Sequence, residues 1–375
     1  MNDERTPRVP TEEGRSETPH GASEPEPAFT PLGKPQQPDI RHRKGDQIHT
    51  GPELAVGEGD VRTAEPGSAV VAVAGTSLWK DAWRRLLKNR LAVFGMIVVV
   101  LIILASIIGP PIIKATAGFD YDDFPADSSL VKSFPPFTAP DGTFSWLHPM
   151  GTDSEGRDIL ARVLQGGRIS LAVGFISTIV SLLIGIGYGA TAGYLGGKVD
   201  DVMMRVVDVL YAIPYMMIVI VLLAFFGSQT PLKQIFLLFA ALGAISWLTM
   251  ARIVRGQVLS LKNQEFVLAA RATGVNVPRI IFRHIVPNVL GPVIVYATLT
   301  IPQVMLSEAF LSFLGLGVQA PYASWGSLAS LGIQNIAIFP WQLIFPGVTM
   351  ALTLFSLNFL GDGLRDALDP QMRKF

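Results

Sequence analysis

Acidic side chains inside apolar stretches are the first candidates for chemistry in this sequence. Asp208 and Glu308 both stand in or near such stretches. A charge at the centre of a membrane helix costs roughly 2.5–3.5 kcal/mol on insertion scales, so these groups usually face a bundle interior. Either acid would therefore suit a path that receives a substrate amine. The structural alternatives are that Asp208 pairs with Arg205 or Lys198, and that Glu308 marks the outer end of its helix.

Catalytic signatures are missing from the chain. The segment "GGKVDD" at Gly196 lacks the first glycine and the hydroxyl residue of a G-x-x-x-x-G-K-[ST] phosphate loop. HExxH, GxSxG and metal-spaced histidine clusters do not occur in the sequence. With no cysteine, thiolate metal sites and cysteine nucleophiles are excluded as well. The sequence therefore predicts neither an enzyme nor a metal site.

The stretch "EFVLAARATGVNVPRIIFRHIVPN", residues 265–288, predicts two short helices. The first stops at Gly274. The second has Asn276 as its N-terminal cap and Pro278 in its first turn. Pro287 is expected to end this helix and to lead into the next apolar segment. The result would be a compact helical hairpin.

The side chains of this predicted hairpin favour binding to another protein. Ala269, Ala270 and Ala272 would form a smooth patch, and Arg279 and Arg283 would share one face as a basic rim. A helix of this kind suits a groove in a partner protein. The alternative is a generic basic loop, but positive charge alone does not require this spacing of small residues, glycine and proline.

These residues must be positioned by membrane helices. Hydrophobic residues make up 49% of the chain and charged residues only 16%, whereas soluble domains contain about 25% charged residues. A bilayer span needs about 20 mostly apolar residues. The sequence predicts an all-α fold with six transmembrane helices, kinked at Pro214 and Pro346, over residues 91–113, 170–192, 206–226, 235–251, 289–311 and 341–360.

The distribution of charge predicts the orientation. Lys and Arg concentrate in "LWKDAWRRLLKNR", residues 78–90, and in the loop 255–288, whereas the loop 114–167 is acidic. Residues 78–90 have the pattern of an amphipathic surface helix. Since positive loops stay in the cytoplasm, both termini and the 255–288 loop are expected there, in a bacterial inner membrane.

Residues 1–77 contain few large apolar residues and are expected to be a disordered cytoplasmic tail. No apolar core of a signal peptide occurs in the first thirty residues. Lys plus Arg and Asp plus Glu number 30 each, so net charge gives no argument for a nucleic-acid partner.

Two further patterns concern helix packing. No charged residue occurs from Ala309 to Gly361, so the connection "GLGVQAPYASWGSLASLGIQNIAIFP" is expected to dip back among the helices. Glycines recur every fourth residue, which allows close approach of another helix. The sequence leaves open whether that helix belongs to this chain. The glycines are Gly185, Gly189, Gly193 and Gly197.

The 265–288 stretch resembles the EAA loop of ABC importer permeases, whose pattern is E-A-A-x-x-x-G followed by I-x-L-P. This chain has Leu268 where the pattern has Glu, and His284 where it has Ile. Glu265, about one turn earlier, is then the acidic candidate. The resemblance implies that the loop couples the permease to ATPases, through Glu265, Ala269, Ala270, Arg271, Gly274, Arg279, Arg283 and Pro287.

Three other segments resemble the dipeptide/oligopeptide/nickel permeases, in particular their C-type subunit. They are "HPMGTDSEGRDILARVLQGGRISL", "SEAFLSFLGLGVQAPYASWGSL" and "NFLGDGLRDALDP". The resemblance covers about residues 78–375 and implies the type I importer fold. It makes the first segment a candidate gate or docking surface for a binding protein, formed by His148, Gly151, Thr152, Asp153, Gly156, Arg157 and Asp158. The preferred explanation for Arg157 and Asp158 is structural: the pair would orient the following helix.

The same resemblance implies a division of labour. A second, B-type permease would complete the path, two ATPase subunits would bind ATP and Mg, and an extracytoplasmic binding protein would deliver a peptide-like solute. This chain would contact lipid and hold no cofactor itself. The alternatives are nickel or another small solute, a secondary transporter, and a membrane scaffold. A secondary transporter would usually show inverted repeats and a midplane ionic site, and neither is clear here.

Overall fold

The computed structural model of the protein describes residues 78–124, 133–139, 141–227 and 230–368. The predicted tail 1–77 lies outside the described residues, as do Arg373 and Lys374. The described chain is helical, as predicted. Its elements are α1 (Leu78–Leu86), α2 (Arg90–Ala117), α3 (Ile159–Leu195), α4 (Gly197–Ala212), α5 (Tyr215–Phe226), α6 (Pro231–Leu261), α7 (Glu265–Ala272), α8 (Val277–Arg279), a π-helical turn (Ile280–Ile285), α9 (Val286–Phe313), α10 (Trp325–Gln334) and α11 (Trp341–Leu368).

The prediction of several membrane spans is confirmed. Among the described residues, α2, α3, α6, α11 and the run from α8 through α9 are long and apolar enough to cross a bilayer. The expected third span, 206–226, is instead two helices, α4 and α5, bent by 78°. The kink is at Pro214 as predicted, but Ile213 before it is fully extended (φ −83°, ψ 130°). A residue before proline disfavours the helical conformation, so the helix breaks there.

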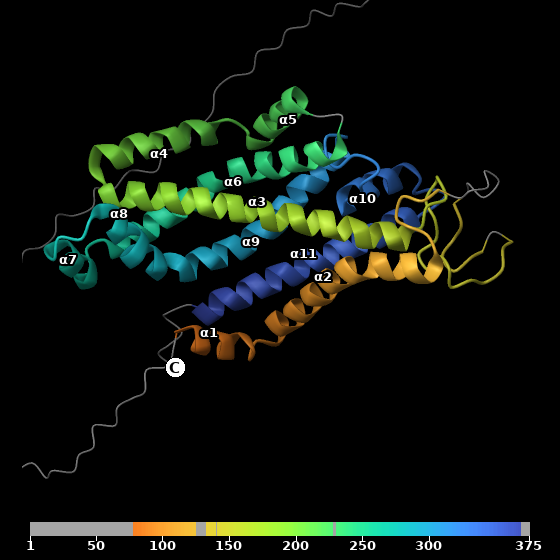
Figure 1. Ribbon diagram of the computed structural model, residues 1–375, viewed down its shortest axis with the longest axis horizontal. Coiled ribbons are helices and arrows are strands. Elements are labelled where there is room, and N and C mark those ends of the chain that lie inside the picture. The colour runs from red at the N-terminus through yellow and green to blue at the C-terminus, as the bar shows by residue number, and fades with distance from the viewer. Residues whose placement is uncertain (1–77, 125–132, 140, 228–229, 369–375) are drawn as a thin grey trace, which may run out of the picture. The chain divides into compact units, whose positions relative to one another are not determined.

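The close approach predicted from the glycine stripe occurs within this chain, between α3 and α6 (Figure 1). A Cβ atom built on Gly185 would lie 2.6 Å from Met250, and one on Gly189 would lie 2.3 Å from the Ala251 carbonyl oxygen. Gly197 does not belong to the stripe, because α3 ends at Leu195. Gly197 has φ +54° and stands in the turn between α3 and α4, with open space around it.

The uncharged connection after α9 is tucked among the helices, as predicted. Its helix α10 packs on α9, α11 and α3. Trp325 at its start is 1% exposed, and its indole Nε1 donates a hydrogen bond of 2.8 Å to the Val163 carbonyl. Tertiary contacts of this kind cover backbone that lipid could not satisfy.

The helix α2 continues through two consecutive prolines with the help of α3. Pro110 and Pro111 have no N–H, so the carbonyls of Ser106 and Ile107, four residues earlier, lose their helical donors. Arg168 of α3 replaces both donors: its Nε lies 2.7 Å from the Ser106 oxygen and its Nη2 lies 2.5 Å from the Ile107 oxygen. One guanidinium therefore satisfies both orphaned carbonyls.

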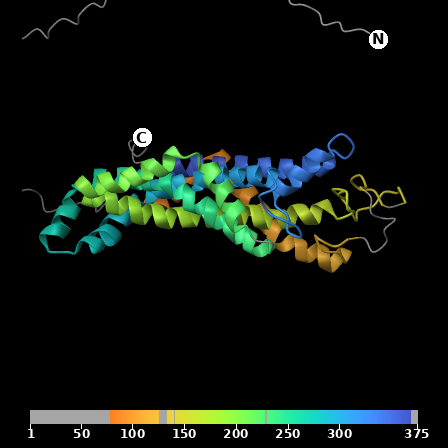
Figure 2. The same cartoon turned by 90° about the horizontal axis from the view of Figure 1, so that it is seen from above.

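The long helices separate two groups of connections. The turn through α7 and α8 lies at one end of the bundle, and the segment before α3 lies at the other (Figures 1 and 2). The helix α3 runs between them, with Ile159 at one end and Leu195 near α7 at the other. The basic 265–288 stretch and the described acidic residues just before α3, among them Asp153 and Asp158, are thus held apart.

Candidate functional site

The first arm of the predicted hairpin, α7, ends where the sequence indicates. Gly274 has φ +75°, a left-handed conformation that favours glycine. Its N–H donates to the Arg271 carbonyl (3.0 Å), and the Val275 N–H donates to the Ala270 carbonyl (3.1 Å). These two bonds form a Schellman motif, which satisfies the last carbonyls of the helix.

The second arm differs from the prediction at both ends. Asn276 occupies the N-cap position of α8, but its side chain makes no capping hydrogen bond. Pro287 does not end the arm: α8 passes through the π-helical turn into α9 without a break. Val286 donates to Ile281, five residues back, so the α-helical ladder is already interrupted before Pro287. In the first turn of α9 a missing N–H is therefore tolerated.

We call residues 265–285 the hairpin. Its buried side chains belong to one apolar core with α3 and α6. Val267 and Ile285 are fully buried, and Ala270 is 7% exposed, so Ala270 faces the core rather than the predicted outer patch. Because Val254 of α6 and Tyr194 of α3 share that core, a force on the hairpin acts directly on both long helices.

The outer surface of the hairpin is apolar and basic. Leu268 is 46% exposed and Phe282 is 56% exposed. Arg279 and Arg283 are exposed and form no ion pair with another residue that the structure describes. The hairpin therefore presents both apolar and cationic side chains on its surface. The other exposed residues of the hairpin are Glu265, Phe266, Ala269, Arg271, Ala272, Thr273, Gly274, Asn276, Val277 and Pro278.

Arg271 differs from the other arginines of the hairpin. Its guanidinium lies 5.6 Å from the ring centroid of Tyr194 and 3.4 Å from that phenol oxygen. Tyr194 stands one residue before the end of α3. Arg271 therefore ties α7 to α3, although the residue remains exposed.

At the opposite end, the predicted docking residues position the start of α3. Asp158 caps the helix, since its Oδ1 accepts from the Ala161 N–H at 2.6 Å. Its Oδ2 lies 2.8 Å from His148 Nδ1. The preferred structural explanation for Asp158 agrees with this geometry. Gly151 and Gly156 have φ of +75° and +81°, so they permit the turns that bring His148 to the helix.

Arg157 takes part in a second, adjoining network. Asp153 Oδ2 accepts from Arg157 Nε (2.9 Å) and from Arg162 Nη1 (3.0 Å). Thr152 is 1% exposed, and its carbonyl accepts from the Trp341 indole at 3.2 Å. The segment is therefore fixed to α3 and α11. The sequence did not single out Arg162 or Trp341, whose roles depend on contacts far apart in the chain.

Asp208 is paired, but not with the neighbours that its sequence suggests. Its Oδ1 lies 2.9 Å from Arg252 Nη2 of α6, and neither Arg205 nor Lys198 is the partner. The Arg252 guanidinium lies 4.2 Å from the ring centroid of Tyr211. Both members of the ion pair remain about half exposed, at 54% and 41%.

Glu308 is 1% exposed and holds α10 against α9. Its Oε1 accepts from Ser312 (2.7 Å) and from Ser324 (2.6 Å), and Ser324 is the N-cap of α10. The carboxyl group of Glu308 thus lies at the N-terminus of α10. Glu308 does not line the cavity described next, whereas its neighbour Ser307 does.

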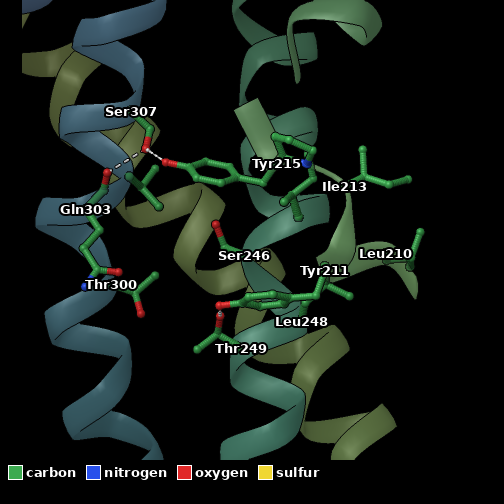
Figure 3. Close-up of a pocket in the computed structure, with 13 residues that line it drawn as sticks. Leu210, Tyr211, Ile213, Tyr215, Ser246, Leu248, Thr249, Thr300, Gln303 and Ser307 are labelled. Carbon is green, nitrogen blue, oxygen red and sulfur yellow. Dashed lines mark hydrogen bonds between the residues drawn. The ribbon is translucent and has the colours of Figure 1, made fainter. Parts of the chain in front are cut away.

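A cavity of about 340 Å³ lies between the α4–α5 junction, α6 and α9 (Figure 3). Tyr215 of α5 reaches towards Ser307 of α9, with 3.2 Å between the two hydroxyl oxygens. The hydroxyl oxygens of Tyr211 and of Thr249 in α6 are 3.4 Å apart. The lining residues are Leu210, Tyr211, Ile213, Pro214, Tyr215, Ile245, Ser246, Leu248, Thr249, Thr300, Gln303, Val304 and Ser307. The lining residues carry no recognisable sequence signal, because hydroxyl residues are common in apolar helices.

Two family models match the chain. Residues 185–374 match the binding-protein-dependent transport system inner membrane component. Residues 77–136 match the N-terminal transmembrane domain of oligopeptide transport permease C. Together the two matches include the hairpin, the cavity and the first membrane helix.

Curated relatives cover most of the chain. The oligopeptide transport system permease protein OppC of Escherichia coli K12 is 50% identical over 83% of this chain and 97% of its own length. The dipeptide transport system permease protein DppC of Bacillus subtilis is 42% identical over 80% of this chain and 87% of its own length. A solved chain of the MetNI methionine ABC transporter gives a TM-score of 0.45 at 18% identity, over 55% of this chain and 96% of that chain.

Proposed function

The chain belongs to the family of binding-protein-dependent transport system inner membrane components, and we propose that it conducts oligopeptides or dipeptides. It is a multi-pass permease subunit of an ABC importer, not an enzyme. The peptide class is supported by the names of relatives that align along nearly their whole length. A second permease chain, two ATPase subunits and a solute-binding protein would complete the importer.

The proposed contact with the ATPases is the hairpin. The observation that carries this proposal is its combination of an exposed apolar and basic surface with a buried core shared by α3 and α6. The sequence holds no phosphate loop, so ATP must be hydrolysed on another chain. With Leu268 in place of the acidic residue, apolar contact at Leu268 and polar contact at Glu265 or the basic residues would bind the ATPase.

The hairpin and α1 are proposed to face the cytoplasm, with both termini. The support is the excess of Lys and Arg in these two segments. The acidic segment 114–158, at the opposite end of α3, would then face the binding protein. In this orientation the hydrogen-bond networks of His148 and Asp153 would hold the docking surface for the binding protein in a fixed conformation.

The test uses the complete importer, reconstituted in vesicles with its binding protein. Leu268→Asp should reduce co-purification of the ATPases and ATP-driven uptake by at least about tenfold, since a buried apolar contact of about 1.5–3 kcal/mol is lost. The matched control for co-purification of the ATPases is Phe144→Asp, an exposed apolar residue (69%) in the segment before α3 and outside the hairpin. Normal ATPase binding and uptake by Leu268→Asp would refute the coupling role.

A further inference from the structure

The cavity of Figure 3 lies where three parts of the chain meet. The α4–α5 junction forms one wall, α6 another and α9 the third. The junction is bent by 78° at Pro214, and α4 is attached to α6 by side-chain ion pairs. A change in the position of α4 would therefore open or close this wall.

The lining is mostly apolar, and its polar side chains are uncharged. Its polar groups are hydroxyls and one carboxamide, and no Asp, Glu, Lys, Arg or His lines it. They belong to Tyr211, Tyr215, Ser246, Thr249, Thr300, Gln303 and Ser307. The nearest acidic and basic groups, Asp208 and Arg252, neutralise each other outside the lining. Such a surface attracts neither ion, but it can both donate and accept hydrogen bonds.

Besides the uncharged polar lining, the side chain of Gln303 also points to a ligand. It is exposed, although it stands in the middle of α9, a helix that is apolar enough to span a membrane. Its side-chain amide has no hydrogen-bond partner among the residues that the structure describes. A polar group at that depth must face protein or a wet cavity, and Figure 3 shows Gln303 beside the cavity.

The hydrogen bond between Tyr215 and Ser307 links α5 to α9 across the cavity. Ser307 Oγ already donates to the Gln303 carbonyl at 2.9 Å, so in the bond of 3.2 Å it accepts from the Tyr215 hydroxyl. A carbonyl of the solute can accept from the Tyr215 hydroxyl in place of Ser307, so that the Tyr215 hydroxyl still has an acceptor. The exchange costs little, because one neutral hydrogen bond replaces another.

On the basis of the proposed function, we propose that this cavity is a transit site for the amide groups of a peptide backbone. Tyr215 donates to a peptide carbonyl, and Gln303 pairs with a peptide amide through its own carboxamide. A volume of about 340 Å³ lies in the range of small-molecule sites, about 300–1,000 Å³. Neutral groups bind the backbone whatever the side chains, whereas a bare metal ion would require carboxylate, imidazole or sulfur ligands.

The experiment measures uptake of labelled trialanine by the complete importer in vesicles, at peptide concentrations below saturation. Gln303→Leu and Tyr215→Phe should each reduce uptake about fivefold, equivalent to about 1 kcal/mol for one hydrogen bond. ATP hydrolysis stimulated by the binding protein should persist, because the hairpin is unchanged. Gln334→Leu, an exposed glutamine of α10 outside the cavity, is the control and should leave uptake unchanged.

A probe with methylated amides separates backbone recognition from general packing. Trialanine methylated at both amide nitrogens should be taken up more slowly than trialanine by the wild type, and Gln303→Leu should abolish that difference. Equal uptake of trialanine by wild type and both cavity variants would overturn the transit site. If the wild-type importer took up no peptide at all, the proposed function itself would fail, and the transit site with it.

Discussion

Replacing Arg168 by leucine tests whether one side chain allows α2 to contain two prolines. In the structure, Arg168 donates to the carbonyls of Ser106 and Ile107, at 2.7 and 2.5 Å. Leucine removes both donors and retains only an apolar stem at this position. The two carbonyls then have no protein donor, because Pro110 and Pro111 cannot supply one.

The expected loss follows from the two hydrogen bonds. A hydrogen bond to a charged group contributes about 1.5–3 kcal/mol. The Ser106 bond is part-buried and the Ile107 bond is exposed, so the second should contribute less. We therefore expect Arg168→Leu to lower the free energy of unfolding by about 2–4 kcal/mol. Titration of the purified protein from mild detergent into dodecyl sulfate, followed by tryptophan fluorescence, measures that difference.

A double-mutant cycle isolates the proline effect. In the variant Pro110→Ala, Pro111→Ala, backbone N–H groups again satisfy both carbonyls. In that background Arg168→Leu should cost less than about 1 kcal/mol, because the acceptors no longer depend on the guanidinium. The contact with Gln165, at 3.2 Å, is lost in both backgrounds and cancels. An equal cost in the two backgrounds would refute the assignment.

Three further predictions follow from contacts described above. Gly189→Ala should destabilise the protein by about 1–3 kcal/mol in the same titration, because its Cβ would lie 2.3 Å from a backbone oxygen of α6, whereas Gly187→Ala, with open space, should be neutral or stabilising. Glu308→Leu leaves two buried serine hydroxyls without their acceptor, so it should lower the free energy of unfolding by about 1–3 kcal/mol and lower the melting temperature. Glu308→Gln should recover most of the loss, and an unchanged melting temperature for the leucine variant would contradict the role given to Glu308. Gly274→Val should weaken ATPase co-purification without changing trialanine binding by the separate binding protein, since the left-handed conformation costs a non-glycine residue about 1–2 kcal/mol; unaltered co-purification would show that the Schellman turn does not orient the hairpin.

The number and approximate positions of the long helices could be predicted because apolar length is a local property of the sequence. The stop at Gly274 was also predictable, since only one residue type fits that conformation easily. The predicted first and last residues of the helices were less accurate. The helix α3 begins at Ile159 rather than near 170, because partners outside the helix satisfy its two arginines. Arg162 pairs with Asp153, and Arg168 donates to the Ser106 carbonyl.

Contacts between distant segments account for the errors at the candidate site. Asp208 pairs with Arg252, which is 44 positions away and outside any local pattern. Ala270 looks like its neighbours in sequence, but the direction of α7 against α6 decides that it is buried. The cavity residues have no local signal for a related reason: their hydroxyls and one amide form a site only where four helices, α4, α5, α6 and α9, bring them together.

The π-helical turn at Ile280–Ile285 also determines an angle. A π turn contains about one residue more than an α-helical turn, so the positions before and after it are out of phase by about 100°. Deleting a single residue there, so that the helix becomes regular, would rotate α7 and α8 by about that amount around the axis of α9. The rotation of the hairpin about the axis of α9 is thus set by the number of residues in this turn. Inserting or deleting one of its buried residues would change that rotation and leave the exposed side chains of the hairpin the same.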